Sequence, residues 1–568
     1  MIPSATTFWS SMPIWLPMVA AVASAILVLA LRRSLRIAQQ ICLIVSLIAV
    51  LAVVSVKNTP GTGPISFSAP AVMSLPVAVL GWPAVFKLTG ASLTILIFVL
   101  ISFLFSLSWL FSARPGGKNL FWLSVQFAFI WGLVTASDLF TIFIFAQLLM
   151  VPQYFLNLGP GHAHHRRIAR RMLVVSIINS TLILAAAILS GSPGNPHVNY
   201  STFAASPSAL LCIVLSIWIS LSLFPFHGVE TTRITVDGQN LLPLNSNIWV
   251  GVALMMWLQH SFFLAQLHGM IRPLAIAGTV AMAACSVACF AQRELSRSMA
   301  YAVAAVSAFA FLAWISQDVM GVVGAILILG VLPVTVFGFQ RGIDLLFLQA
   351  QDISTLPEGR SSPGGAAHLL FLLLTAACIG MPATTVFRGV WFALIGMIEA
   401  AAQSGRIELQ TVIFGVLALS VLVPMILGVI SRSLLAFRDP AQNIRRPDIN
   451  VHTGSIGTAE DSTFTAPLNL AAYIGAARRW AILGMMVSLV LGVFPILAIG
   501  PLLESLQHPA TRSTPSHPIL PPAPPFHEVI VDHISIRAAS IEASLHCRGN
   551  IGHQHRQESG SIRGEVPV

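Results

Sequence analysis

Long apolar runs separated by short polar segments follow one another along most of this chain. Each run is roughly 18 to 24 residues long, which is the length a helix needs to cross a hydrocarbon core about 30 Å thick. We therefore predict an all-α polytopic membrane protein with about fourteen transmembrane helices. The expected spans are 14–31, 37–56, 90–112, 119–135, 137–157, 172–191, 208–226, 247–267, 273–291, 299–316, 319–340, 366–402, 409–430 and 480–503.

Two of these runs are interrupted, which predicts that the seventh and twelfth helices are broken. The run at 366–402 is too long for one crossing and contains Pro382, and the run at 208–226 ends at Pro225. Proline removes a backbone donor and clashes with the preceding turn. Irregular backbone at membrane depth is tolerated only where protein or a polar cavity satisfies the freed groups. Both breaks are therefore candidate functional elements.

The polar segments divide the chain into five parts. We expect N-terminal helices and an external loop at 1–89, a transmembrane core at 90–430, a cytoplasmic loop at 431–479, a last transmembrane helix at 480–503, and a polar, disordered tail at 504–568.

Composition agrees with a membrane protein and excludes a soluble enzyme. Hydrophobic residues make up 56% of the chain and charged residues only 9%, whereas soluble domains carry about 25% charged residues. The net charge of +10 does not indicate a nucleic-acid partner, because the basic residues lie between the apolar runs.

The distribution of basic residues predicts the orientation of the chain. The side of the first loop collects most of the arginines, among them Arg33, Arg166, Arg170 and Arg341, and few basic residues fall on the opposite side. Because cytoplasmic loops are enriched in Lys and Arg, we expect a multi-pass protein of the cell inner (plasma) membrane with both termini on the non-cytoplasmic side.

No sequence pattern indicates a cofactor or a metal. The chain contains no iron–sulfur cysteine pattern and no glycine-rich dinucleotide fingerprint. Cys285 and Cys289 are one helical turn apart, but no further His or Cys accompanies them. Any redox chemistry therefore belongs to partner proteins.

Four short motifs occur in a characteristic order. They lie at 136–152, 225–227, 291–301 and 380–387 and read ASDLFTIFIFAQLLMVP, PFH, AQRELSRSMAY and GMPATTVF. With about fourteen helices, of which two are broken, this order resembles the antiporter-like membrane subunits of respiratory complex I and of multisubunit cation/proton antiporters, most closely complex I chain M. The resemblance covers about residues 90–430.

The resemblance implies a proton path of alternating lysine, glutamate and histidine on broken helices near the bilayer midplane. Ionisable groups are costly in lipid and persist where they pair or meet water. This sequence departs from that pattern. Its only three lysines all lie in loops, so a different alignment would not restore a buried lysine. The family glutamate, lysine and histidine positions correspond to Gln147, Met255 or Met256, Gly330, Pro333 and Val390.

Few ionisable residues remain in the first nine spans, and each has two interpretations. Asp138 starts the fifth helix, where it caps the helix or admits protons. His227 lies at the helix-seven break, three residues before Glu230. The two residues either pair within a proton half-channel or make a contact on a surface loop. His260 in the eighth span is a hydrogen-bonded structural residue or a proton carrier.

The later candidates are charged residues beside the tenth and twelfth spans. Glu294 and Arg297 are one turn apart and favour an ordinary interfacial ion pair. Arg388 follows the break in the twelfth span, and Glu399 lies about three turns further on. Arginine does not release its proton as lysine does, so Arg388 is expected to be a static countercharge or a snorkelling side chain.

The sequence therefore predicts a membrane subunit of an NADH-quinone oxidoreductase-type complex that takes part in proton translocation coupled to electron transport. Its partners are other membrane subunits, the lipid bilayer, and protons or small cations. The alternatives are a pump-inactive structural paralogue, or a membrane subunit of a cation/proton antiporter or of an inorganic-carbon uptake complex on the same scaffold.

Overall fold

A computed structural model describes part of the chain, and the statements below concern that part. It covers residues 5–31, positions 37, 40–42, 44, 45 and 48, residues 73–77, 82–86, 90–113, 117–158, 163–190, 207–228, 231, 232, 234, 246–260, 264–292, 294–355, 365–379, 384–403, 429 and 470–493. The predicted spans at 37–56 and 409–430, most of the loop at 431–479, and the tail at 504–568 lie wholly or mainly outside these ranges.

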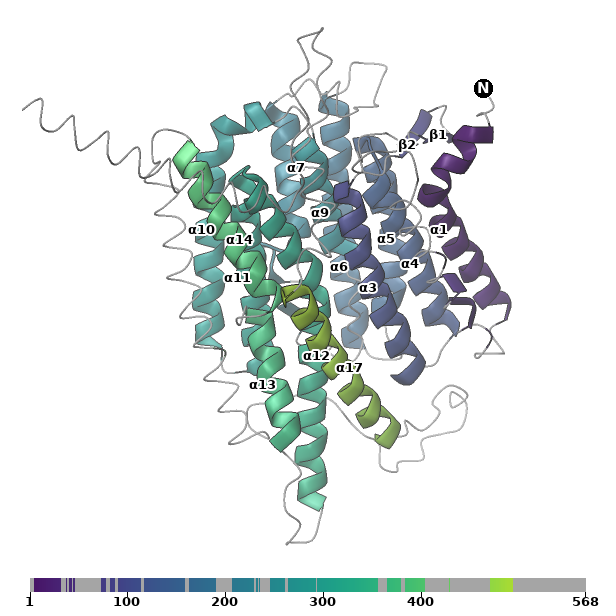
Figure 1. The fold of residues 1–568 in the computed structure, drawn as a ribbon, viewed down its shortest axis with the longest axis vertical. Helices are drawn as coiled ribbons and strands as arrows, with labels where there is room; N and C mark the ends of the chain where they lie inside the picture. The colour runs from purple at the N-terminus through teal and green to yellow at the C-terminus, as the bar shows by residue number, and fades with distance from the viewer. Residues whose placement is uncertain are drawn as a thin grey trace, which may run out of the picture. The chain divides into compact units, whose positions relative to one another are not determined.

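The described part is built from long α-helices that run side by side (Figure 1). The helices are α1 (Ala5–Ala30), α3 (Gly90–Ala113), α4 (Gly117–Thr135), α5 (Leu139–Asn157), α6 (Ala163–Ser190), α7 (Pro207–Ser220), α9 (Ser246–His260), α10 (Leu264–Ala291), α11 (Leu295–Ile315), α12 (Val319–Thr355), α13 (Gly365–Ile379), α14 (Thr385–Gln403) and α17 (Leu470–Val493).

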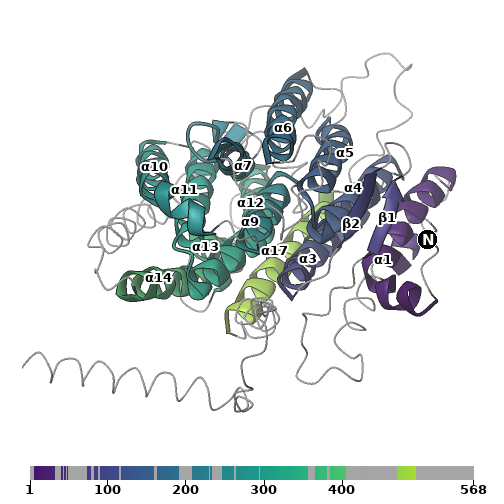
Figure 2. The ribbon, with the colours of Figure 1, turned by 90° about the horizontal axis from the view of Figure 1, so that it is seen from above.

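The helices differ in how much of their surface other helices cover. Within the described ranges, six helices are long and apolar enough to cross a membrane. The protein buries 94% of the apolar window in α11 and 89% of that in α12, but only 39% of those in α6 and α10. Figure 2 accordingly shows α12 and α9 between the other helices, with α6 and α10 on the outside. The exposed apolar faces of α6 and α10 are those that lipid or another protein would cover.

Tight packing of α12 against α14 depends on glycine. A Cβ atom added at Gly396 would lie 2.1 Å from the backbone nitrogen of Gly321, and one added at Gly324 would lie 2.5 Å from the backbone nitrogen of Ala393. Small residues let helix backbones approach closely, which is a common way to pack helices in membranes. The two backbones therefore touch directly.

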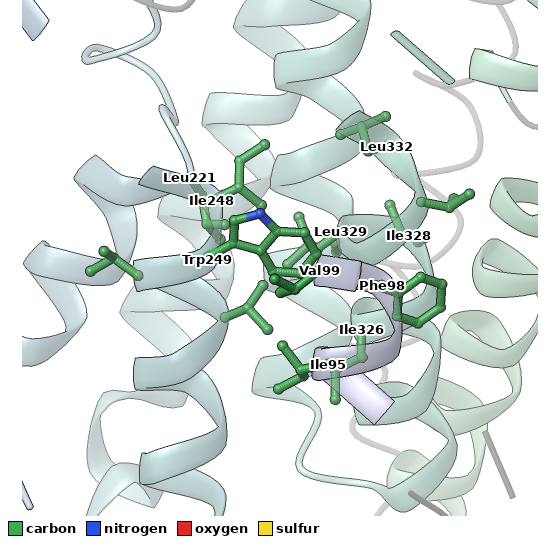
Figure 3. Packing of buried hydrophobic residues seen from close by; sticks show 14 of the residues in the cluster. Ile95, Phe98, Val99, Leu221, Ile248, Trp249, Ile326, Ile328, Leu329 and Leu332 are labelled. Atoms are coloured by element: carbon green, nitrogen blue, oxygen red, sulfur yellow. The ribbon is translucent and has the colours of Figure 1, made fainter. Parts of the chain in front are cut away.

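A tryptophan fills the contact between α3, α9 and α12. Figure 3 shows the indole of Trp249 on α9 among Leu221, Val99 of α3 and Leu329 of α12. Trp249 is fully buried at 0% exposure, so its large apolar surface helps to hold these helices together.

A short β-hairpin was not expected from the sequence. Strand β1 (Met73–Val77) pairs antiparallel with β2 (Trp82–Phe86), with Met73 opposite Phe86. Phe86 also forms an isolated antiparallel bridge with Ala136. The hairpin lies in the predicted external loop and leaves the all-α class of the membrane part unchanged.

Two described helices occupy the predicted twelfth span, and several helix ends differ from the prediction. Helices α13 and α14 flank the predicted break at Pro382. Helix α7 ends at Ser220, six residues before the predicted end of the seventh span, and a turn follows it. Helix α10 starts at Leu264 and continues through Pro273, where the sequence was expected to separate two spans.

Two revisions move arginines from predicted loops into helices. Helix α6 begins at Ala163 instead of residue 172 and therefore includes Arg166 and Arg170. Helix α12 continues to Thr355 instead of ending at residue 340, so Arg341 is a helical residue. Charged residues ended the apolar windows, but arginine is a good helix former, and the backbone continues through it.

Candidate functional site

Gln147, which the resemblance places at the family glutamate position, is held by a hydrogen bond to a neighbouring helix. Its Nε2 on α5 donates a hydrogen bond to the Oγ of Ser180 on α6 at 2.6 Å. The Ser180 hydroxyl in turn donates to the carbonyl oxygen of Ile177 at 3.0 Å. The amide thus makes a defined contact between two helices, although it does not titrate as a carboxylate does.

Asn179, the residue before Ser180, joins α6 to α7. Its Nδ2 donates to the Oγ of Ser220 at 2.7 Å, and the Oγ of Ser216 donates to its Oδ1 at 2.6 Å. All three side chains are buried. One amide therefore satisfies two hydroxyl groups on successive turns of α7, which is the arrangement that buried polar groups require.

A third contact extends these interactions to α9. Ser176 on α6 and Asn247 on α9 are both buried, and the Ser176 Oγ lies 3.4 Å from the Asn247 Oδ1, a long and therefore weak hydrogen bond. We call these side chains the polar seam: Gln147, Ser176, Asn179, Ser180, Ser216, Ser220 and Asn247. The polar seam connects α5, α6, α7 and α9, and every member is uncharged.

The other positions at which the family carries charge are apolar in this chain. Met255 and Met256 are buried at 1% and 6% exposure on α9. A Cβ atom added at Gly330 of α12 would lie 2.6 Å from the Phe98 ring of α3, so this ring occupies the space that a histidine would need. The positions to which the resemblance assigns these family residues are therefore packed with apolar groups.

His227 lies in the turn after α7, at the predicted break. Its ring stacks on Phe224 with centroids 5.4 Å apart and lies 5.3 Å from the ring of Tyr301 on α11. Its Nδ1 is buried and has no hydrogen-bond partner in the described part of the chain. His227 is thus half-buried in a turn and contacts two aromatic rings.

Asp138 caps α5, which confirms the structural interpretation of this residue. Its backbone is extended, its Oδ2 accepts a hydrogen bond from the backbone nitrogen of Thr141 at 2.7 Å, and its Oδ1 accepts one from the Thr141 hydroxyl at 2.7 Å. Asp138 is fully buried. The carboxylate satisfies an otherwise unpaired amide at the helix start and complements the helix dipole.

Glu294 and Arg297 form the predicted ion pair. The Arg297 Nε lies 2.9 Å from the Glu294 Oε2, and the two side chains are 56% and 35% exposed for Arg297 and Glu294 respectively. Such exposed pairs contribute little to stability. The geometry does not connect them to the polar seam.

Arg388 and Glu399 are both half-buried on α14. They are eleven residues apart on one helix, a separation of about 16 Å along the axis, so they do not pair with each other. Glu230 lies outside the described residues, and so does the side chain of His260, which is the last residue of α9.

Arg341 is a buried cation that the sequence reasoning had assigned to a cytoplasmic loop. It is 0% exposed on α12. Its guanidinium carbon lies 4.0 Å from the centroid of the Trp109 ring on α3 and 5.1 Å from that of Phe337. A guanidinium stacked on aromatic rings is stabilised by the negative ring faces. Beside it, the Gln340 Nε2 donates to the carbonyl oxygen of Ile234 at 3.0 Å.

The polar seam and Arg341 were missed because no single stretch of sequence reveals them. Besides Gln147, the signal for the polar seam was the run Ser176 to Ser180, which places three polar residues within the predicted apolar span 172–191. For Arg341 the signal was the adjacent Gln340 at the end of a long apolar run. Within the described ranges, no three His, Cys, Asp or Glu side chains gather as metal ligands would.

Sequence comparison finds relatives among respiratory membrane subunits. The chain is 28% identical over 207 residues to NADH-quinone oxidoreductase subunit N of Salinispora tropica, covering 33% of this chain and 39% of the relative. It is 22% identical over 288 residues to the subunit N of Desulforudis audaxviator, covering 48% and 57%. The matches thus span about two fifths and under three fifths of these relatives, and both carry the name subunit N, not chain M. No family model matches the chain.

Solved structures share the fold over most of the chain. A chain of respiratory complex I from Thermus thermophilus superposes with a TM-score of 0.60 at 20% identity, covering 88% of this chain and 98% of the other. A chain of the Mrp complex from Dietzia sp. gives a TM-score of 0.62 at 15% identity, covering 89% and 98%. At these identities the superpositions establish the fold.

The sequence matches, the shared fold and the broken twelfth helix agree with the motifs at 136–152 and 380–387. The chain is a multi-pass membrane protein that shares its fold with chains of respiratory complex I and of the Mrp complex, and part of its sequence is similar to NADH-quinone oxidoreductase subunit N.

Proposed function

We propose that this chain is a membrane subunit of an NADH-quinone oxidoreductase-type complex and takes part in proton translocation coupled to electron transfer in its partners. The polar seam is the observation that carries this proposal. Hydrogen-bonded polar side chains inside an apolar bundle are costly and mark functional paths in membrane proteins. Gln147 among them lies at the position that the resemblance assigns to the family glutamate, and Ser216 and Ser220 lie on α7, before the predicted break.

The chemistry of the polar seam suits one step of proton translocation, the orientation of hydrogen bonds along the path. Serine hydroxyls both donate and accept hydrogen bonds, whereas amides and hydroxyls do not hold an extra proton at neutral pH. The polar seam therefore orients hydrogen bonds and water between α5 and α9 without storing a proton. His227 is the titratable group next to it along the chain, seven residues after Ser220, and we propose that it exchanges protons with the path.

The remaining candidates take other roles in this proposal. Asp138 caps the start of α5, and the pair Glu294 and Arg297 is a surface contact at the start of α11. Arg388 provides a fixed countercharge near the helix-twelve break. Glu230 and His260 stay candidates for the ends of the path, and the proposal does not depend on them.

We further propose that the protein lies in the plasma membrane with both termini on the non-cytoplasmic side. The strong bias of arginines toward the loops on one side supports this orientation. The proposed partners are other membrane subunits, because the solved relatives are chains of multisubunit complexes.

A pump-inactive structural subunit is the second candidate function. Gln147 in place of a carboxylate, and the buried pair Met255 and Met256 in place of a lysine, favour it. In that case the polar seam would serve only to hold α5, α6 and α7 together. The two functions predict different numbers of protons translocated per electron when a substitution removes hydrogen bonds of the polar seam.

Proton translocation by the intact complex separates the two functions. The complex would be purified through a tag on this chain and reconstituted into vesicles, and protons translocated per electron would be measured with NADH and a quinone. Asn179→Leu removes the amide that joins Ser216 and Ser220, and Ile188→Leu, an exposed position on the same helix, is the matched control.

Our proposal predicts fewer protons per electron in Asn179→Leu, with electron transfer and subunit composition unchanged, and no change in the control. An unchanged ratio in an intact Asn179→Leu complex would establish the structural role instead. If no redox subunits co-purify with the wild-type chain, the assignment to an NADH-quinone oxidoreductase-type complex is wrong.

A further inference from the structure

Four arginines are exposed together at the start of α6. Arg166, Arg167, Arg170 and Arg171 occupy two consecutive turns, and all four are exposed. In the part of the chain that the structure describes, no ion pair or hydrogen bond involves any of their guanidinium groups. We call these residues the arginine cluster.

The nearby sequence offers almost no negative charge to balance the arginine cluster. Asp138 is the only acidic residue among the first 229 residues. It caps the start of α5, whereas the arginine cluster follows the other end of that helix, which is about 28 Å long. The first turn of α6 contains no acidic residue, and positive charge there opposes the helix dipole. The arginine cluster therefore favours an anion from outside this stretch.

The exposed face of α6 continues from charged to apolar. At about 100° per residue, the four arginines and the next exposed residues fall within an arc of about 140°. Those residues are Val174, Ile177 and Ile178, which are 50%, 43% and 47% exposed. Ile168 and Met172 lie on the opposite side of the helix and are buried. One face thus presents guanidinium groups and then, within two turns, branched aliphatic groups.

Aromatic residues lie at the same end of the adjacent helices. Trp122 near the start of α4 stacks on Phe155 near the end of α5, with ring centroids 4.3 Å apart and an interplanar angle of 8°. Tyr154 packs edge-on against Phe155 at 5.5 Å. Tryptophan and tyrosine are enriched at the level of lipid headgroups, and α5 contacts both α4 and α6. These rings therefore mark the membrane interface beside the arginine cluster.

We propose that the arginine cluster binds the headgroup phosphate of an anionic phospholipid whose acyl chains lie along Val174 and Ile178. Guanidinium groups bind phosphate oxygens through paired hydrogen bonds. The spacing of one turn between Arg166 and Arg170 presents two such groups on one stripe of the helix. This binding site does not depend on the proposed role in proton translocation.

The continuous apolar face favours a lipid over an acidic segment of a partner protein. An acidic peptide would satisfy the arginines but leave the exposed aliphatic groups directly below them without a matching surface. A phospholipid supplies both the negative headgroup and the hydrocarbon in one molecule, in the order in which α6 presents their partners. Anionic lipid in the cytoplasmic leaflet attracts basic segments in this way.

Lipid binding by the full-length chain in detergent tests this assignment. Native mass spectrometry would count bound dioleoylphosphatidylglycerol and, in a parallel titration, dioleoylphosphatidylcholine, which has the same acyl chains. The test variant is Arg166→Gln with Arg170→Gln. The control, Arg272→Gln with Arg478→Gln, loses the same net charge at two exposed arginines elsewhere.

We expect the wild type and the control to bind phosphatidylglycerol in preference to phosphatidylcholine. Each arginine removed from the arginine cluster should weaken phosphatidylglycerol binding about fivefold, so the double variant should lose about 25-fold. The corresponding double lysine variant should retain most of the binding, because it keeps the charge. Unchanged elution from a sizing column shows that the variants remain folded.

Four results would overturn the proposal. The first is equal binding of the two lipids by the wild type. The second is equal loss in the test variant and the control. The third is displacement of phosphatidylglycerol by millimolar inorganic phosphate, which would indicate a site for free anions. If the chain binds the lipid alone but not within its purified complex, an acidic partner segment covers the arginine cluster and the assignment to lipid is wrong.

Discussion

The contact between α12 and α14 gives a sharp test of the helix packing. Gly396→Ala adds a Cβ atom 2.1 Å from the backbone nitrogen and 2.6 Å from the Cα of Gly321. Neither of these backbone atoms can turn away as a side chain can. Gly484→Ala in α17 is the matched control, because its Cβ would have Gly338 Cα at 3.6 Å as its nearest neighbour, an ordinary van der Waals contact.

The two substitutions should change stability in opposite directions. Alanine favours a helix over glycine by up to about 1 kcal/mol, and Gly484→Ala should gain part of this. At Gly396 the two helices must move apart by about 1 Å or more to reach normal contact distances. Such overpacking costs about 1 to 3 kcal/mol and at times more. Because both variants gain the helix propensity of alanine, their free energies of unfolding should differ by the overpacking cost, about 1 to 3 kcal/mol.

Thermal unfolding of the purified chain in one detergent, followed by tryptophan fluorescence and by the loss of the monomer peak on a sizing column, would measure the difference. Gly396→Ala should melt below the wild type, and Gly484→Ala at or above it. If Gly396→Ala melts with the control, the α12 and α14 backbones are not in contact, and the packing described above is wrong.

Substitutions at three further residues test individual side chains by the same unfolding measurement. Asp138→Ala should lower the free energy of unfolding by about 1 to 2 kcal/mol, because it removes a helix cap, and Asp138→Asn by clearly less; equal losses would exclude capping as the cause. Arg341→Lys should lower it by about 2 kcal/mol, since an ammonium group does not stack on the rings as a guanidinium does; a neutral result would refute the stacking. Glu294→Gln should change it by less than about 1 kcal/mol, because its pair with Arg297 is exposed, and a larger loss would show that this pair has a role beyond the surface.

The sequence was sufficient for the helices whose ends coincide with changes in polarity. The predicted spans 90–112, 119–135 and 137–157 agree with α3, α4 and α5 to within two residues at each end. A hydrocarbon core sets both the length and the composition of a helix that crosses it, so an apolar window is direct information about these elements.

Hydropathy did not locate helix ends where the helices continue beyond the apolar region. Arg166 and Arg341 were read as loop residues, yet both lie in helices. Hydropathy reports the preference of side chains for lipid, whereas a helix is maintained by backbone hydrogen bonds that continue through charged residues. Arg341 is also completely buried, because Trp109 and Phe337 cover it, and these residues are distant in the sequence.

The absence of buried lysine could be predicted from the sequence, whereas the hydrogen bonds of the polar seam could not. Gln147 was singled out from the sequence alone, through its resemblance to a charged family position. The bonds of Asn179 to Ser216 and Ser220 depend on how α6 is rotated against α7, and no property of the separate helices fixes that rotation. Buried polar groups seek partners, but the sequence does not say which.

The measurement that addresses the central claim most directly is the number of protons moved per electron by the complex that contains this chain. If the uncharged polar seam serves proton translocation, Asn179→Leu lowers this number while NADH oxidation continues at the wild-type rate. An assembled complex with Asn179→Leu that pumps at the full wild-type ratio would contradict the account.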